Sequence, residues 1–416
     1  MKLFVFDDRI ADGWAPFSLT RPCSELLLGT YLLRERIERW AGIACSGLVT
    51  RPWLESFTEQ GAPPVVPTSR LPEHETAIFV CSRAVVTGGS IPAGDRPANL
   101  WIGETLVGSS VPAGAPRPAA GWFTDPGPLS GAEDVPLEGD VLCEPWDFVS
   151  SNPDRLLADL SAPEVEGIGD PSVAPAEAGD LPRGVELLGR GALLLGDGVT
   201  LEPGVLLDTR RGPIRLDSKV EVRAGSRLEG PLYAGPGSRL LGGPISVVAA
   251  GPRCTLRGEI QRSVVLGYSN KAHAGFLGHA YLGRWVNLGA MTTNSDLKNN
   301  YRPVRMGPPG AERDTGLLKL GCLLGDHVRT GIGLLLNTGT VVGAGSNLFG
   351  TEMPPNWVEP FSWGSGRELV EYRKDAFLAT AQTVLERRGV AFDPPTRRWL
   401  AAVWDAGRTS AGGRLA

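Results

Sequence analysis

No stretch of this sequence approaches the roughly 18 consecutive apolar residues that a membrane-spanning helix requires. The apolar run at the N-terminus is short as well, because Asp7 and Asp8 interrupt it before it reaches the length of a secretory signal. We therefore expect a cytoplasmic protein that has no membrane partner.

An excess of positive charge is also missing. The chain has 41 Lys and Arg residues against 46 Asp and Glu residues, a formal net charge of −5. The chain has no long basic stripe that could displace counterions from a phosphate backbone. This argues against nucleic-acid binding. The six cysteines lie far apart and form no C-x-x-C pair, which argues against a zinc knuckle or a disulfide framework and fits the reduced cytoplasm.

Glycine and proline, in contrast, are abundant, with 55 and 35 residues. A hydrophobic content of 42% is nevertheless too high for a disordered chain. Many tight turns around a real core would explain both observations. The length of 416 residues is sufficient for two domains with substantial cores.

The first part of the chain is predicted to be an α/β domain, residues 1–162. Leu3–Phe6 is a continuous apolar run, as expected of a parallel strand that is covered on both faces. Thr20 and Pro22 provide a cap and an early-helix proline, and apolar residues between Leu26 and Trp40 recur at helical spacing. Further elements are predicted as strands around 47–50, 77–81, 100–107 and 141–143, and as a short helix over 152–160.

An acidic stretch rich in Pro, Ala and Gly follows, with little to bury (SAPEVEGIGDPSVAPAEAGD, from Ser161). This composition indicates a linker, residues 163–183. Beyond it a six-residue repeat begins, as in Leu324-Gly-Asp-His-Val-Arg followed by Thr330-Gly-Ile-Gly-Leu-Leu. One aliphatic residue in six pointing inward, with small residues at the corners, predicts a three-sided parallel β-helix over 184–352, of the left-handed kind known for hexapeptide repeats.

Two segments do not follow the repeat. Residues 294–316 are too polar and turn-rich to fit a coil, so we predict a loop that leaves the solenoid, a common place for function. Residues 353–416 form a C-terminal extension, in which the spacing of apolar residues over 368–388 predicts a helix and 393–407 a second one.

The residues from Tyr268 to Tyr301, with Asn270-Lys271-Ala272-His273 and Phe276-Leu277-Gly278, resemble the acetyltransferase half of bacterial GlmU-type proteins. The chain is more similar still to the divergent GlmU-like sugar nucleotidyltransferases, which open with a strand that ends in Asp-Asp, as Asp7-Asp8 does here. They also carry a Thr-Arg-Pro, found here from Thr20 onward. The resemblance implies a homotrimer with an active site in each cleft between neighbouring solenoids. It further implies transfer of an acetyl group from acetyl-CoA to glucosamine-1-phosphate, and coupling of the product to UTP with Mg²⁺ by the N-terminal half.

His273 is our candidate for the catalytic residue. An amine attacks a thioester only after it loses a proton, and a neutral imidazole within hydrogen-bond reach is a suitable base. The resemblance places His273 at the family's catalytic histidine, although a histidine on a β-helix is more often an ordinary surface or core residue.

The resemblance also implies a binding role for several residues around His273. Asn287 occupies the position that holds the amino sugar, and its alternative role is an asparagine ladder at a solenoid corner. Phe276 replaces a tyrosine that contacts the sugar, and Asn300-Tyr301 matches a pair that borders the site. Ala290 and Thr330 match positions along the pantetheine arm, with tight-turn residues as the alternative. The remaining candidates, as sites for the sugar or its phosphate, are Asn270, Lys271, Arg262 and Lys298.

In the N-terminal half, Asp7 and Asp8 at the end of the first strand are candidates for Mg²⁺ ligands, and Arg9 and Arg21 for contacts to a nucleotide triphosphate. The glycine-rich loop that usually cradles phosphates after this strand is absent, since only Gly13 is present in 7–14.

Two other interpretations remain open. One is a non-catalytic regulatory or scaffold subunit with a nucleotidyltransferase-like domain and hexapeptide repeats. The other is a γ-type carbonic anhydrase, in which three of the four histidines (His74, His273, His279, His327) bind zinc.

Overall fold

The computed structural model describes residues 1–92, 95–161 and 172–411. The chain divides into two compact units. The first contains residues 1–26, 31–145 and 378–416, and the second contains 27–30 and 146–377. The domain boundaries predicted from the sequence at 162, 183 and 352 stay predictions. None of the helices in the described parts is both long and apolar enough to cross a membrane.

The first unit is built on a mixed sheet of seven strands in the order β4-β1-β5-β8-β7-β9-β6. The strands are β1 (Lys2–Phe6), β4 (Cys45–Val49), β5 (Ala77–Cys81), β6 (Ala84–Gly88), β7 (Ala98–Ile102), β8 (Thr105–Val111) and β9 (Glu133–Val141). The strand predicted over Leu3–Phe6 is confirmed as β1, which pairs in parallel with β4 and β5. Leu3 and Val5 pack into one core cluster and Phe4 and Phe6 into another, so the strand is covered on both faces as expected.

Two predictions for this unit are wrong in detail. The segment around 100–107 is an antiparallel hairpin of β7 and β8, because Gly103, with φ +56°, turns the chain. The helix expected from residue 26 begins only at Leu33 and runs to Ala41 (α2), because Leu27–Leu28 (β2) pairs with Tyr31–Leu32 (β3) across Gly29, whose φ is +63°. The strand predicted at 141–143 is also misplaced, because β9 runs over Glu133–Val141 and shares only Val141 with it.

The remaining helices of the first unit are short, apart from the last one. They are α1 (Arg9–Asp12), α3 (Ala120–Thr124) and α7 (Pro394–Ala411), and the larger part of α6 (Lys374–Arg387) also belongs to this unit. The Trp399 Nε1 of α7 donates to the Thr20 carbonyl at 2.8 Å, and its ring lies edge-on to Phe57 at 5.0 Å. The C-terminal helix is therefore part of the N-terminal unit's core.

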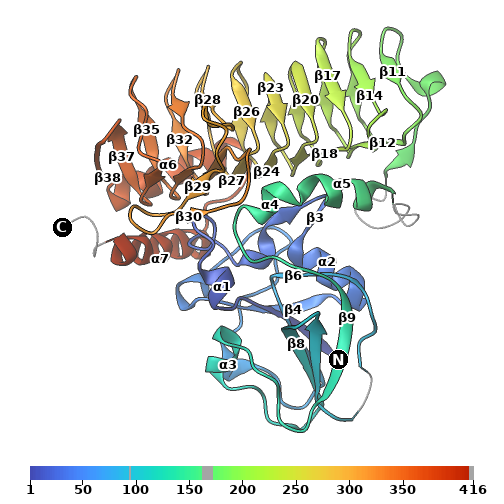
Figure 1. The fold of residues 1–416 in the computed structure, drawn as a ribbon, viewed down its shortest axis with the longest axis vertical. Coiled ribbons are helices and arrows are strands. Elements are labelled where there is room, and N and C mark those ends of the chain that lie inside the picture. Colours follow the sequence, from blue (N-terminus) through green and yellow to red (C-terminus); the bar gives the residue numbers. More distant parts are fainter. Residues whose placement is uncertain (93–94, 162–171, 412–416) are drawn as a thin grey trace. The chain divides into compact units, whose positions relative to one another are not determined.

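The second unit is a β-solenoid whose coils stack along its axis (Figure 1). Strands that are far apart in sequence pair in parallel from one coil to the next, and the inward aliphatic residues of all coils form one core cluster. The three-sided parallel β-helix predicted from the six-residue repeat is confirmed. The strands of its first face are β10 (Ala174–Pro175), β12 (Leu193–Leu195), β15 (Ile214–Leu216), β18 (Leu232–Ala234), β21 (Ala249–Ala250), β24 (Val264–Gly267), β27 (Tyr281–Arg284), β31 (Cys322–Leu324), β34 (Thr340–Val342) and β36 (Trp357–Val358).

The second and third faces complete each coil. The second face contains β11 (Glu186–Leu188), β14 (Leu206–Asp208), β17 (Ser226–Glu229), β20 (Gly243–Ser246), β23 (Glu259–Gln261) and β26 (Phe276–Gly278), and later β28 (Thr293–Asn294) with β33 (Leu335–Leu336). The third face contains β13 (Thr200–Leu201), β16 (Glu221–Val222), β19 (Arg239–Leu240), β22 (Thr255–Leu256) and β25 (Asn270–Lys271), and later β32 (Arg329–Thr330), β35 (Asn347–Phe349), β37 (Ser362–Ser365) and β38 (Glu368–Glu371).

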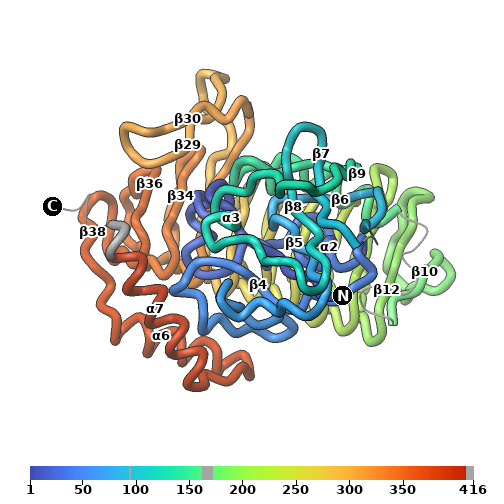
Figure 2. The backbone as a smooth tube through the Cα atoms, turned by 90° about the horizontal axis from the view of Figure 1, so that it is seen from below, coloured from blue at the N-terminus to red at the C-terminus, as the bar shows by residue number. Residues whose placement is uncertain are grey.

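The chain leaves the solenoid once, between β28 and β31, close to the predicted position. This insertion, residues 295–321, carries a small hairpin of β29 (Arg305–Met306) and β30 (Arg313–Asp314), seen as the projecting orange loop in Figure 2. The helix predicted over 368–388 is wrong in its first part: β38 pairs with β37 at the end of the solenoid, and α6 (Lys374–Arg387) follows.

Residues 27–30 and 146–161 also belong to the solenoid unit. These residues include the helices α4 (Asp147–Ser150) and α5 (Asn152–Ser161) and the short strand β2 from the N-terminal part of the chain. The Tyr281 hydroxyl of β27 accepts from Leu27 N at 2.9 Å and donates to Leu27 O at 3.2 Å, while Asn152 accepts from Gly29 N at 2.9 Å. The helix predicted over 152–160 is confirmed as α5.

Candidate functional site

In the first unit, polar residues gather where three parallel strands end. The strands β4, β1 and β5 are neighbours in the sheet, and the residues after them are Thr50-Arg51, Asp7-Asp8 and Ser82-Arg83. The carboxyl ends of parallel strands are where open α/β sheets bind ligands.

The Asp7 carboxylate accepts hydrogen bonds from three groups and forms an ion pair with a fourth. Thr50 Oγ1 donates at 2.6 Å, Ser82 Oγ at 2.7 Å and the Cys23 backbone N–H at 3.1 Å, while Arg51 Nη1 lies 3.2 Å away. Two carboxylate oxygens offer about four lone-pair directions. The acceptor capacity of Asp7 is therefore used by the protein itself.

Asp8 is engaged in the same way. Its Oδ1 caps the short helix α1 through Ala11 N at 2.9 Å, and both oxygens accept from Arg83 Nε at 3.0 and 2.8 Å. Arg83 Nη2 lies a further 2.7 Å from Oδ2. Both side chains are buried.

These contacts do not fit the predicted magnesium site at Asp7 and Asp8. Mg²⁺ needs free carboxylate oxygens, and here a guanidinium already neutralises each carboxylate. Across the described ranges, no group of three or more His, Cys, Asp or Glu side chains is arranged to hold a metal ion.

The two arginines predicted to contact a nucleotide differ in their placement. Arg21 is fully buried and donates to both oxygens of Glu59, at 2.8 and 3.0 Å. Arg9 lies at the surface and pairs with Asp125 at 2.9 Å. Arg9 alone therefore presents a guanidinium to solvent, and the nucleotide contacts of both residues stay predictions.

Two cavities border the end of β1. One, of about 430 Å³, is lined by Asp7, Asp12, Arg51 and residues of β4 and α3. The other, of about 490 Å³, is lined by Asp8, Arg9, Arg83 and the β7–β8 turn. Burial raises the pKa of the Asp12 carboxyl in the first cavity, and the adjacent Arg51 opposes this shift.

In the solenoid, His273 lies at the corner between β25 on the third face and β26 on the second. Its side chain is exposed. The corner of the next coil carries Ala290 and Met291, and Met291 N donates to the carbonyl of Ala274 at 2.9 Å. The imidazole is therefore accessible to a ligand along this corner.

The predicted site residues on the third face form hydrogen bonds from one coil to the next. Asn270 Nδ2 donates to Asn287 Oδ1 at 2.9 Å, so the two amides form a ladder between coils. Thr330 is buried one coil further along, where its hydroxyl lies 2.7 Å from Thr292 Oγ1 and accepts from Gly289 N at 3.0 Å. The asparagine ladder considered from the sequence is thus present, Ala290 lies in a turn, and Thr330 lies in strand β32 rather than in a tight turn.

Lys271 does not reach the surface. The residue is 2% exposed, and its ammonium donates to the carbonyls of His273 at 2.8 Å and Arg257 at 3.2 Å. Phe276, the next candidate along the chain, stands on the second face over Gly278, where an added Cβ would meet its ring at 2.3 Å.

The other candidates lie further along the coil. Arg262 is exposed at the corner that follows the second face. Lys298, Asn300 and Tyr301 belong to the insertion, where Lys298 Nζ donates to Pro303 O at 2.9 Å and Tyr301 is 71% exposed. The structure therefore brings His273, Asn270, Asn287 and Ala290 together on adjacent coils, but it does not bring this second set to the His273 corner.

Sequence reasoning gave little weight to His279, which forms a dyad with Asp296. His279 Nδ1 lies 2.7 Å from Asp296 Oδ2, and the hydrogen bond from the ring holds the pKa of Asp296 below its usual value in spite of burial. Gly321 N donates to the His279 carbonyl at 2.8 Å, so the dyad joins both ends of the insertion to β26. No repeat signal reveals it, because Asp296 lies outside the coils.

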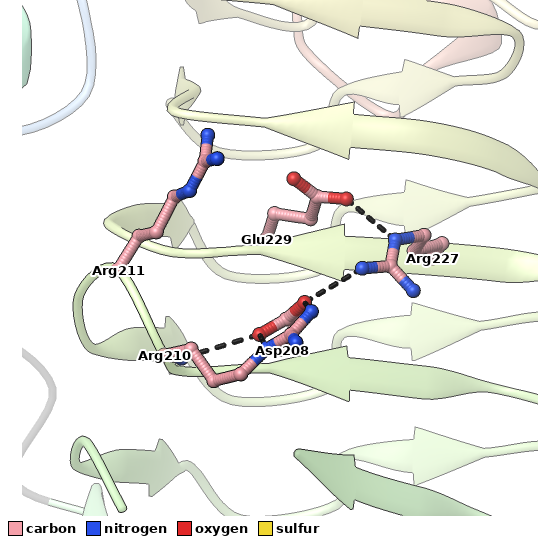
Figure 3. Close-up of a pocket in the computed structure, with 5 residues that line it drawn as sticks. All are labelled: Asp208, Arg210, Arg211, Arg227 and Glu229. Carbon is pink, nitrogen blue, oxygen red and sulfur yellow. Dashed lines mark hydrogen bonds and ion pairs between the residues drawn. The ribbon is translucent and has the colours of Figure 1, made fainter. Parts of the chain in front are cut away.

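A third cavity, of about 310 Å³, lies on the second face near the start of the solenoid (Figure 3). The Arg210 guanidinium donates to both oxygens of Asp208, at 2.9 and 2.6 Å, and Arg227 bridges Asp208 and Glu229. Hydrogen bonds from Arg210 lower the pKa of Asp208 to about 2. Arg211 extends away from these pairs in Figure 3. Because the charges nearly balance, we regard this cavity as a structural ion-pair network.

Residues 3–164 match the family model described as sugar nucleotidyl transferase. A bifunctional sugar-1-phosphate nucleotidylyltransferase/acetyltransferase of Sulfurisphaera tokodaii is 27% identical over 145 residues, covering 33% of this chain and 36% of that protein. The bifunctional protein GlmU of Methylococcus capsulatus is 29% identical over 175 residues, covering 41% and 34%. These matches span about a third of each relative's length.

Among solved structures, an Arabidopsis UDP-N-acetylglucosamine acyltransferase aligns with 50% of this chain and 77% of its own. Its sequence identity to this chain is 13% and the TM-score is 0.29.

Proposed function

We propose that this chain, whose residues 3–164 match the family model described as sugar nucleotidyl transferase, transfers an acyl group from an acyl-CoA to an amino-sugar phosphate. Acetyl-CoA and glucosamine-1-phosphate are the first substrates to test. The observation that carries the proposal is the exposed imidazole of His273 on a solenoid corner, which is hydrogen-bonded through Ala274 to the corner of the next coil that carries Ala290 and Met291. The similarity to the S. tokodaii protein, which is named a bifunctional sugar-1-phosphate nucleotidylyltransferase/acetyltransferase, supports it.

His273 acts as the base in this reaction. The amino group of the sugar is protonated near neutral pH and first loses one proton to solvent. The neutral imidazole removes a second proton as the resulting amine attacks the thioester carbonyl carbon. A carbon–nitrogen bond forms, and the carbonyl oxygen becomes an oxyanion. When the carbon–sulfur bond breaks, the thiolate of coenzyme A leaves and takes up the proton from the imidazolium.

The backbone N–H of Ala290 is our candidate donor for the oxyanion. The N–H groups on either side of it are engaged, Gly289 with Thr330 and Met291 with Ala274. Within the described chain, no acceptor takes a hydrogen bond from Ala290 N. A donor that is already fixed in place stabilises developing charge without reorganisation.

The test is release of free thiol from acetyl-CoA with a panel of amino-sugar phosphates. We expect activity in the wild type and a loss of about 100-fold or more in His273→Ala, the range for removal of a general base. His74→Ala, in the other unit, is the matched control and should keep full activity. If the wild type releases no thiol with any amino sugar, the acyltransferase proposal fails and the scaffold interpretation gains.

A second candidate function is transfer of a nucleotidyl group from a nucleotide triphosphate to a sugar-1-phosphate by the first unit. The family match and the two cavities beside β1 favour it. The engaged carboxylates of Asp7 and Asp8 oppose a metal at that position, so we derive no step through Mg²⁺. Pyrophosphate release from UTP in the presence of the acetylated sugar phosphate tests this function, and Arg9→Ala should lower the rate if Arg9 contacts the triphosphate.

We also propose a cytoplasmic homotrimer with a site between neighbouring solenoids. Exposed apolar side chains on successive coils, Met291, Ile332 and Phe349, follow the His273 corner and support an interface there. Sedimentation equilibrium of the full chain tests the assembly, since a monomer at micromolar concentration would contradict it.

A further inference from the structure

A lysine occupies a position inside the solenoid where most other coils place an aliphatic residue. On the third face, strand register aligns the inward residue of each coil with the next one. We call this set the third-face column. Its members, in coil order, are Leu201, Val222, Leu240, Leu256, Lys271, Leu288, Thr330 and Leu348.

Burial of the charged Lys271 side chain at this position lowers the stability of the folded state. A charge removed from water destabilises the folded state unless other groups compensate it, and a carboxylate is the usual partner. Lys271 forms no salt bridge within the described ranges, and burial alone is the cause that lowers the pKa of its ammonium to about 8. A leucine would fill the column without this penalty, so the lysine calls for a functional explanation.

The two acceptors of the ammonium show what the lysine does. The carbonyls of Arg257 and His273 lie at the same corner of successive coils, after β22 and after β25. The side chain therefore ties two corners together from inside the solenoid. One of the two carbonyls belongs to the residue whose imidazole is exposed outside.

Side-chain packing does little to fix the backbone of the corner that carries His273. The residues around His273 are Ala272, Ala274 and Gly275, whose side chains are too small to anchor a segment by packing. Gly275 has φ +131°, a conformation that only glycine adopts easily. The direction of the imidazole thus depends on hydrogen bonds to the backbone of this corner. The Lys271 ammonium donates one of them from inside the core.

We propose that Lys271 is a positioning residue for His273, which fixes the corner carrying the imidazole by binding its carbonyl from within the solenoid. This inference rests on the proposed acyl transfer. It assigns Lys271 a different role from the phosphate contact expected from the sequence, because the ammonium points to backbone carbonyls.

The kinetic test compares Lys271→Met, which keeps the length of the side chain, and Lys271→Leu, which restores the aliphatic column. Leu240→Met, two coils earlier in the same column, is the matched control. We expect both lysine variants to fold and to lose about 10- to 100-fold in kcat, the scale of a 1 Å misplacement, with KM for the sugar phosphate nearly unchanged. The control should keep its kcat. A rise in KM at constant kcat would instead indicate a phosphate contact and overturn the proposal, as would unchanged kinetics.

A second measurement is independent of activity. The chain has four histidines, so the imidazoles of histidine-labelled protein give few NMR signals, which His→Ala variants assign. In Lys271→Met we expect the chemical shifts of the His273 signals to change while those of His74 stay fixed. Unchanged His273 signals would overturn the positioning role. If the wild type proves to have no acyltransferase activity but the His273 signals still move, the proposed function fails and the positioning role of Lys271 stands.

Discussion

Arg83 and Asp8 form a buried ion pair at the end of the first strand, with Arg83 Nε 2.8 Å and Nη2 2.7 Å from Asp8 Oδ2. Residue 8 therefore meets its counter-charge from the end of the neighbouring strand β5. This pair converts a carboxylate that looks like a metal ligand in the sequence into a structural element.

Removing one member of this pair should destabilise the first unit. Asp8→Ala leaves the Arg83 guanidinium buried without its main partner and removes the cap of α1, a loss of about 3–5 kcal/mol in the free energy of unfolding. Urea denaturation followed by tryptophan fluorescence measures it. Arg83→Met combined with Asp8→Ala should be less destabilised than the sum of the single variants; strict additivity would contradict the coupling.

Magnesium should not bind at Asp7 and Asp8 in the free protein. Because ligands that bind only the folded state raise its melting temperature, about 10 mM MgCl₂ should leave the Tm unchanged once an equal ionic strength of NaCl is taken as reference. Asp7→Asn serves as control. A clear rise in Tm that disappears in this variant would show that the hydrogen bonds to Asp7 give way to the metal.

The stability of the wild type should rise with pH relative to Lys271→Met. The folded-state pKa of Lys271 is about 8, below the ordinary 10.5, so between these values the unfolded chain binds more protons than the folded one. The difference in unfolding free energy between the two proteins should shift in favour of the wild type by up to about 3 kcal/mol from pH 7 to pH 10.5. A constant difference over this range would contradict a buried, titrating ammonium.

Lowering the pH should remove the contribution of the Asp208 carboxylate to the stability of the fold. Its folded-state pKa of about 2 lies below the usual value, so its carboxylate stabilises the fold above about pH 4 and loses this effect as the pH falls toward 2. Compared with Asp208→Asn, the wild type should have the higher Tm at pH 7 and a similar Tm near pH 2. Asp197→Asn, at an exposed turn, is the matched control and should show no such convergence.

The solenoid could be predicted from the sequence because its physical rule is local. One inward aliphatic residue in six and small corner residues are visible along the chain, as in Leu324 and Leu336, and the strands follow from them. The first strand could be predicted as easily, because a strand that is buried on both faces appears in the sequence as a continuous apolar run. The helix start at Leu33 was not predictable from spacing, because the pairing of β2 with β3 overrides the helical pattern before it.

The charged partners were harder to predict, because they depend on which strands become neighbours. Arg51 and Arg83 each follow a strand, as Asp7 and Asp8 do, and comparing all strand ends would have indicated the cluster. The inward direction of Lys271 needed the exact register of β25 against β22, which the sequence shows only approximately. The dyad of His279 and Asp296 needed the position of the insertion.

The docking of residues 27–30 on Tyr281 has a consequence for any attempt to divide this protein. A fragment that begins after the linker would lack Leu27, which supplies both backbone partners of the Tyr281 hydroxyl at 2.9 and 3.2 Å. A fragment that ends before the linker would keep this short strand but have no coil to receive it. The order of the residues along the chain therefore does not coincide with the order of its folding units, and a clean cut between the two halves does not exist.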